Sequence, residues 1–140
     1  LGGQNEKEKN KLISIIKKSS IKCFILHCVS IYPTTPGKSN INYIDFLIDK
    51  YQDKNIKVGY SGHEEGYAAS LLASLKNISL IERHFSLDKY LKIHHIKSAI
   101  LPSEFMEMKR TIIEINKENK SLIKSSSKDE KIFLQKKIYK

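Results

Sequence analysis

The feature that most constrains the fold is an alternation of short strand-like runs with longer helical patterns. Residues 22–29 form a continuous apolar run rich in strand formers, and shorter runs follow at 56–61 and 78–85. Four other segments carry apolar residues at helical spacing, at 5–19, 41–52, 67–76 and 102–117. This α-β-α-β-α-β-α order predicts an α/β fold of parallel βαβ units with right-handed crossovers.

Two of these segments give more detailed expectations. Residues 22–29 lack polar alternation, which is typical of a strand that is buried on both faces. Asn40 stands where a side-chain cap for helix 41–52 is expected. Residues 86–101 show no regular pattern, and we predict an irregular stretch there.

The last predicted helix opens with Pro102 at its first position, followed by acidic residues in the first turns. Its apolar face consists of Phe105, Met108, Ile112 and Ile115. In the tail, three serines at 125–127 predict a linker, and the apolar run 131–135 is too short to be a domain.

The net charge of +10 is compatible with nucleic-acid binding, but the distribution of the charge argues against it. Residues 1–20 and 117–140 carry most of the excess, and the middle of the chain is nearly balanced. Arginine, the residue suited to bidentate phosphate and base recognition, occurs only at 83 and 110. We therefore predict a lysine-rich solvated surface and no nucleic-acid partner.

No apolar run approaches the ~20 residues needed to span a bilayer, and the first residues lack the apolar core of a secretory signal. Cys23 and Cys28 lie five positions apart on one predicted strand, so their side chains point to opposite faces and cannot form a disulfide. We therefore expect a reduced, cytoplasmic chain with no membrane partner.

Ligand-type side chains gather where each predicted strand ends, which is where parallel α/β folds place their functional residues. His63 and His84 follow neighbouring strands, one β-α-β step apart. Neighbouring strands lie ~4.8 Å apart, so two such imidazoles can converge on one metal ion, with Glu82 orienting a bound water or an imidazole. The alternative is two loop histidines. Ser30 and Ser61 can hydrogen-bond a phosphate.

Four other residues with reactive side chains have simpler explanations. We predict that His27 packs in the core and that Cys28 is a buried strand cysteine rather than a nucleophile. His94 and His95 are predicted to be a surface pair in a loop.

Three blocks of the chain resemble the N-acetylneuraminate (sialic acid) synthase family. Residues 26–34, LHCVSIYPT, resemble the family segment L-x-C-x-S-x-Y-P-T. Residues 57–64 resemble V-G-Y-S-[DG]-H, and 81–89 resemble E-[KR]-H-[FI]-T-L-D-[RK]. A looser block at 101–104 resembles the helix start L-E-P-x-E. The resemblance covers residues 1 to about 117, and the GYSGHE and ERH forms are similar to the subgroup that includes animal-type synthases.

This resemblance implies a partial TIM (β/α)8 barrel over residues 1–117, about strands 6–8 with flanking helices. Residues 118–140 would be a basic linker toward an antifreeze-like domain. It also implies condensation of phosphoenolpyruvate (PEP) with an amino-sugar, an N-acetylated amino-hexose of the N-acetylmannosamine type. The products would be a nonulosonic acid and phosphate. A divalent metal, manganese or magnesium, would act as Lewis acid, and the full-length relative would be a homo-oligomer. A legionaminate- or pseudaminate-type synthase fragment and an inactive association module remain alternatives.

The resemblance also assigns roles to the strand-end residues. His63 and His84 would bind the metal, Ser30 and Ser61 would bind the PEP phosphate, and Glu82 and Tyr32 would be catalytic, with Tyr32 also contacting the sugar. In the loop that follows, Ile93 and His95 replace a family glycine and a family aspartate that contacts the sugar. His95 is therefore a sugar-binding position that has lost its acceptor.

Residues 1–3 resemble the end of the family's fifth strand. On that basis we expect a fragment that lacks strands one to four and the antifreeze-like domain and that is inactive on its own.

Overall fold

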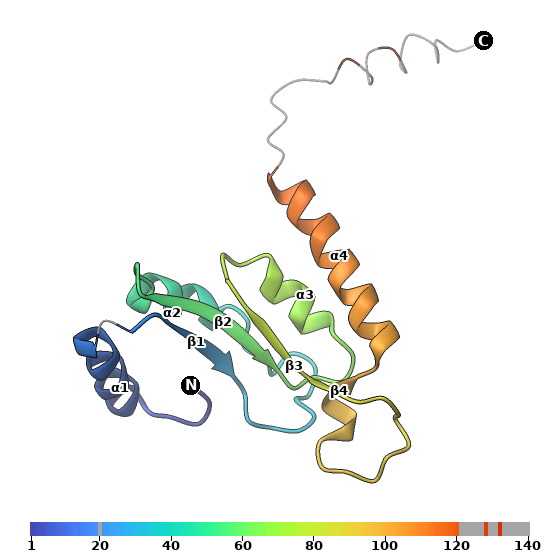
Figure 1. The fold of residues 1–140 in the computed structure, drawn as a ribbon, viewed down its shortest axis with the longest axis horizontal. Coiled ribbons are helices and arrows are strands. Elements are labelled where there is room, and N and C mark those ends of the chain that lie inside the picture. Colours follow the sequence, from blue (N-terminus) through green and yellow to red (C-terminus); the bar gives the residue numbers. More distant parts are fainter. Residues whose placement is uncertain (20, 121–127, 129–131, 133–140) are drawn as a thin grey trace.

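The computed structural model describes residues 1–19, 21–120, 128 and 132. Within these residues, four parallel strands form one sheet in the order β1-β2-β3-β4, and helices alternate with them (Figure 1). The elements in chain order are α1 (Glu6–Ser19), β1 (Cys23–Cys28), α2 (Tyr43–Tyr51), β2 (Ile56–Gly62), α3 (Ala68–Ser74), β3 (Ile81–Phe85), the 3-10 helix η1 (Ile96–Ser98), β4 (Ala99–Ile100) and α4 (Pro102–Lys120). Each strand pairs with the strand before it in the chain, as in the wall of a barrel. The predicted α/β fold with parallel strands is confirmed.

Strand β4 is an element that the sequence analysis does not predict. It has two residues and pairs with His84 and Phe85 of β3. A strand this short shows no alternation in the sequence, and it lies in the stretch predicted to be irregular. The described sheet therefore has four strands rather than three.

Strand β1 is buried on one face only, so the prediction of burial on both faces is wrong. Ile25 and His27 are buried, whereas Phe24 is 54% exposed. Alternation along the strand places Phe24 on the sheet face that points away from α2. We call this the inner face; it also carries Ser61, Glu82 and His84. The continuous apolar run thus belongs to a strand with one face against the helices and one half-open face.

Helix α2 begins later than predicted, and Asn40 is not its cap. The residue at the helix entrance is Asn42, which makes no side-chain capping hydrogen bond. Asn40 instead adopts a left-handed backbone conformation with φ of 47°, which asparagine tolerates better than most residues. Its carbonyl oxygen accepts a hydrogen bond from the amide of Tyr43, so a backbone turn leads into the helix.

Helix α4 begins at Pro102 as predicted and extends to Lys120. Met108 is buried on its predicted apolar face, but Phe105 on the same face is 41% exposed. No described helix is both long enough and apolar enough to cross a membrane. The predicted linker at 125–127 and the run 131–135 lie outside the described residues, apart from residue 132.

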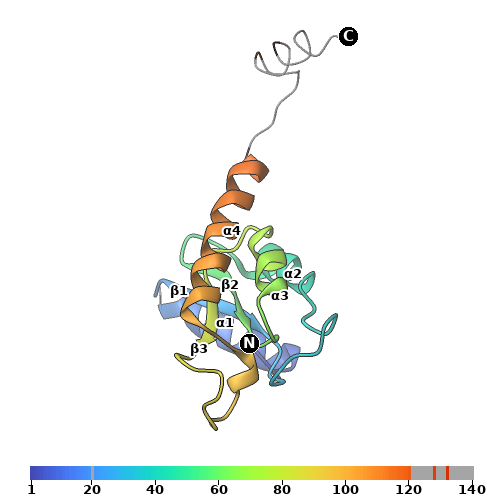
Figure 2. The ribbon, with the colours of Figure 1, turned by 90° about the vertical axis from the view of Figure 1, so that its right-hand side faces the viewer.

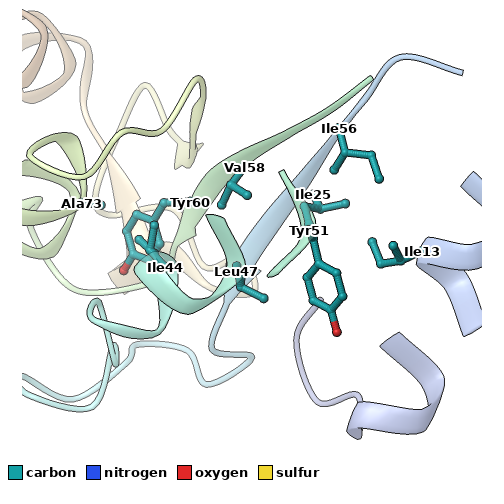
Figure 3. Close-up of a cluster of buried hydrophobic side chains, with 9 residues drawn as sticks. All are labelled: Ile13, Ile25, Ile44, Leu47, Tyr51, Ile56, Val58, Tyr60 and Ala73. Atoms are coloured by element: carbon teal, nitrogen blue, oxygen red, sulfur yellow. The ribbon is translucent and has the colours of Figure 1, made fainter. Parts of the chain in front are cut away.

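The main core lies between the sheet and helices α1, α2 and α3 (Figure 3). Figure 2 shows α2 and α3 together on one side of the strands. Ile44 and Leu47 of α2 point toward the sheet and are fully buried, as are Ile56 and Val58 of β2. Each fully buried side chain of this kind contributes about 1.5–3 kcal/mol. This packing fixes the strands, so their carboxyl ends meet at one edge of the sheet, beside the loops that follow β1 and β3 (Figure 1).

Candidate active site

The strand register brings the ends of β1 and β2 level with the first residues of β3. Cys28 pairs with Ser61, and Ser61 pairs with Glu82. The loop after β1 is tied to the end of β2 because the amide of Thr34 donates to the carbonyl of His63, at 2.9 Å. Side chains that are far apart in the sequence therefore share one edge of the sheet, as predicted.

His63 and His84 lie side by side, with ring centroids 5.2 Å apart. His63 Nδ1 lies 3.0 Å from the carbonyl oxygen of Val29. That oxygen can only accept, so we assign the proton to Nδ1, which leaves the lone pair on Nε2. An imidazole held by a backbone carbonyl through one nitrogen is the usual arrangement of a metal-ligating histidine.

His84 is also suited to bind a ligand as a neutral imidazole. Burial lowers its pKa, and the neighbouring His63, His95 and Arg83 lower it further, while Glu82 opposes them. The carboxylate of Glu82 accepts a hydrogen bond from Ser61 Oγ at 2.9 Å. The two imidazoles, a carboxylate and a hydroxyl thus meet where the end of β2 lies beside β3.

The donor set fits a divalent metal ion with open coordination positions. No preformed group of three or more histidine, cysteine or acidic side chains able to hold a metal occurs in the described part of the chain. His63 and His84 supply two nitrogen donors, and the remaining positions would fall to water or substrate oxygens, as in catalytic rather than structural sites. The metal roles of these residues stay a prediction.

Tyr32 covers the histidine pair. Its ring centroid lies 4.2 Å from that of His63 and 5.6 Å from that of His84. The ring of His95 packs on the ring of Tyr32, with centroids 3.8 Å apart. The backbone of His95 adopts a left-handed conformation. His94 is exposed as predicted, but His95, also exposed, packs on Tyr32 and lies 5.5 Å from the ring of His84.

Ser30 and Cys28 form the β1 side of the site. Cys28 Sγ lies 3.5 Å from Ser30 Oγ and 3.8 Å from His63 Nδ1. Cys28 is half-buried rather than buried because its side chain points to the inner face, and both it and Cys23 are free thiols. His27 is a core residue as predicted, since it is buried and its Nε2 lies 2.8 Å from the carbonyl oxygen of Ser39.

A buried ion pair behind the site is the main feature that the sequence analysis missed. Arg83 Nη1 lies 2.5 Å from Glu64 Oε1, with both side chains almost fully buried. The sequence contains one indication of this buried ion pair. Arg83 alternates with Glu82 and His84, so it points to the helix-covered face, where an arginine needs a partner.

Comparisons with known proteins identify relatives of this arrangement. A model of the NeuB family matches residues 1–124. N-acetylneuraminate-9-phosphate synthase of Drosophila melanogaster is 31% identical over 112 residues, which cover 79% of this chain and 30% of that protein. N,N'-diacetyllegionaminic acid synthase of Campylobacter jejuni is 30% identical over 132 residues, which cover 92% of this chain and 39% of that protein.

A solved structure with a related name also matches the fold of this chain. The sialic acid synthetase of Leptospira borgpetersenii, determined with citrate, matches with a TM-score of 0.80 and 27% identity, over 96% of this chain and 46% of that chain. The described fold is therefore consistent with part of a TIM barrel. The chain spans about a third of the length of the curated relatives it matches. Because the family match extends over most of its length, the chain belongs to the NeuB family.

Proposed function

We propose that this chain contributes part of the active site of a nonulosonic acid synthase. The enzyme would condense PEP with an N-acetylated amino-hexose of the N-acetylmannosamine type and release phosphate. The observation that supports this proposal most directly is the convergence of His63, His84, Glu82 and Ser61 where the end of β2 meets β3. The synthases among its relatives support the reaction class.

Each side chain has a distinct task in this reaction. His63 and His84 hold a manganese or magnesium ion, which when bound would polarise the sugar aldehyde as a Lewis acid. Glu82 accepts a hydrogen bond from a water or a sugar hydroxyl and keeps it oriented. Tyr32 presents its ring to the sugar from above the histidine pair.

Ser30 and Ser61 bind the phosphate of PEP in this proposal. A serine hydroxyl rotates freely, so Ser61 can turn its proton from Glu82 toward a phosphate oxygen. Fixing both substrates at one edge of the sheet aligns the enol carbon of PEP with the aldehyde carbon that it attacks. The methylene carbon of the PEP enol forms the new carbon–carbon bond, water adds to the neighbouring carbon that carries the phosphate, and phosphate leaves that carbon by carbon–oxygen cleavage to give the keto group.

Calorimetric titration with Mn²⁺ tests the metal site directly. We expect saturable binding to the wild-type chain and none to the His63→Ala/His84→Ala variant. His94→Ala is the matched control, because His94 is an exposed histidine of the neighbouring loop and is expected to bind like the wild type. Equal binding to all three proteins, or no binding to any, would contradict the proposed site.

A second candidate function is an association module, and the inner face of the sheet favours it. Phe24 and Leu80 are partly exposed, and Leu80 lies over Gly59 on that face. Apolar side chains beside unpaired strand edges favour pairing with another chain. Size-exclusion chromatography over a range of concentrations tests this function, and a monomer at every concentration would exclude obligate pairing between copies.

A further inference from the structure

The Glu64–Arg83 pair lies directly behind the candidate active site, on the helix side of the sheet. Glu64 follows His63, and Arg83 stands between Glu82 and His84. Successive strand residues point to opposite faces, so the backbone that presents Glu82 and His84 to the site also presents Arg83 to the pair. The position of the ion pair and the positions of the site side chains are therefore linked through one short piece of backbone.

The carboxylate of Glu64 is held from three elements. Ser70 of α3 donates to Oε1 from both its amide and its hydroxyl, at 2.9 and 2.8 Å, and the hydroxyl of Tyr60 on β2 donates to Oε2 at 3.1 Å. Arg83 of β3 completes the set at 2.5 Å. The contacts from Tyr60 and Ser70 are directed hydrogen bonds to a charged group, which are stronger and more orienting than those between neutral groups.

The guanidinium of Arg83 extends the same network to backbone atoms. Nη2 donates to the carbonyl oxygen of Glu64 at 2.8 Å and to that of Ser98, just before β4, at 3.0 Å. Nη1 also donates to Ser70 Oγ at 2.9 Å. The network thus fixes the chain after His63, the start of α3, strand β3 and the entrance to β4 relative to one another.

Stability alone does not explain such a pair. A buried ion pair contributes little net stability compared with apolar side chains of the same size, because both charges lose their hydration. Its side chains are only 3% and 7% exposed here, so that cost applies in full. What the ion pair adds over apolar packing is a fixed distance and direction between β2 and β3.

We infer that Glu64 and Arg83 are positioning residues, which set the separation of the His63 and His84 imidazoles by locking the end of β2 to β3. This inference rests on the proposed function only in taking those imidazoles as metal ligands. The geometry it invokes exists without any ligand.

The test compares Arg83→Met, Glu64→Gln and the double variant with the wild-type chain by NMR of the histidine ring carbons, without metal. The chain has five histidines, and His94 serves as the internal reference. We expect the ring signals of His63 and His84 to move in both single variants while that of His94 stays in place. With Mn²⁺ present, we expect affinity to fall about tenfold or more, as for other residues that orient metal ligands.

The double variant separates positioning from charge balance. Each single variant leaves one buried charge without a partner, and the double variant leaves none. We therefore expect the double variant to be thermally more stable than either single variant. The His63 and His84 signals should nevertheless remain displaced. Recovery of both stability and wild-type ring signals would overturn the inference, as would single variants that fold with unmoved His63 and His84 signals.

Two further variants guard against misleading outcomes. Arg83→Lys keeps the charge without the planar guanidinium, and we expect it to fold with smaller displacements in the same direction. Asp45→Asn breaks an exposed ion pair with Lys76 and is expected to leave all the ring signals in place. Failure of every Glu64 and Arg83 variant to fold would assign the pair to stability alone and overturn the inference. Because the ring signals are recorded without metal, a chain that does not bind Mn²⁺ refutes the proposed function and leaves this test intact.

Discussion

At Gly62 the backbone has no room for a side chain. A Cβ atom there would lie 2.8 Å from Glu64 Oε2 and 2.9 Å from Tyr60 Cε1. Both neighbours are buried and hydrogen-bonded to each other, so neither can move aside freely. A glycine at the end of β2 is therefore what allows the ion pair to approach the strand so closely.

We predict that Gly62→Ala lowers the free energy of unfolding by about 1–3 kcal/mol, the usual cost of overpacking a filled site. Urea denaturation measures the change. Lys57→Ala, at an exposed position of the same strand, is the control and should stay within about 0.5 kcal/mol of the wild type. An alanine variant as stable as that control would contradict the prediction.

Single residues also show what the sequence could reveal. The proximity of His63 and His84 was predictable, because one β-α-β step separates residues at matching strand ends. The partner of Arg83 was not assigned, because Glu64 lies beyond the end of β2, in the segment that leads to α3, and this segment gives no periodicity from which to place its side chain. The prediction that Asn40 caps α2 was wrong for a related reason, since asparagine favours both helix caps and left-handed turns.

At the scale of elements, a charged cluster joins α1 to α2. Glu6 of α1 accepts hydrogen bonds from Lys50 and Tyr43, at 2.7 and 2.9 Å, and from Lys9 at 3.3 Å. These donors, chiefly Lys50, lower the pKa of Glu6 from 4.5 to about 2. The cluster therefore favours the folded state only while Glu6 is ionised.

The stability that the cluster adds should disappear as pH falls from about 4.5 toward 2. A folded-state pKa below the unfolded value means that the unfolded chain binds the proton first, so acid favours unfolding in this window. We expect the melting temperature of the wild type to fall more steeply between pH 5 and 2 than that of Glu6→Gln. Glu65→Gln, an exposed position elsewhere, should keep the wild-type slope. Identical slopes for Glu6→Gln and the wild type would refute this prediction.

Helix α4 offers a second test at this scale, because two methionines on it differ in burial. Met108 is 4% exposed and Met106 is 60% exposed. We predict that Met108→Ala lowers the free energy of unfolding by about 2–5 kcal/mol, and that Met106→Ala changes it by less than about 0.5 kcal/mol. Denaturant unfolding of the two variants side by side gives the comparison, and equal effects would show that α4 does not pack through Met108.

Helices and strands could be predicted from the sequence where they are long enough for their apolar residues to show a regular spacing. Among the described residues, the four predicted α-helices and three predicted strands appear near their expected positions, with ends shifted by a few residues. Strand β4 was missed because its two residues are defined by hydrogen bonds to β3 rather than by any pattern of their own. The one-sided burial of β1 was missed because an apolar run does not show whether both faces are covered.

At the scale of the whole molecule, the chain carries only part of what its relatives contain. It corresponds to 30% of the fly synthase and 39% of the legionaminic acid synthase. We predict that the 140-residue chain alone releases no phosphate from PEP in the presence of N-acetylmannosamine and Mn²⁺. A sensitive phosphate assay on the purified chain tests this prediction. Release of phosphate together with an equal amount of a nine-carbon keto acid would contradict it.

The order of the strands in the sheet follows their order in the chain, and this affects how the fold can form. Cys23 pairs with Ile56, Tyr60 with Ile81 and His84 with Ala99, so each new strand closes one crossover onto the strand before it. Each doubling of the length of a loop adds only about 0.6 kcal/mol to the cost of closing it, so these crossovers can close one after another. The sheet can therefore grow one strand at a time as the polypeptide leaves the ribosome, with each completed strand serving as the template for the next.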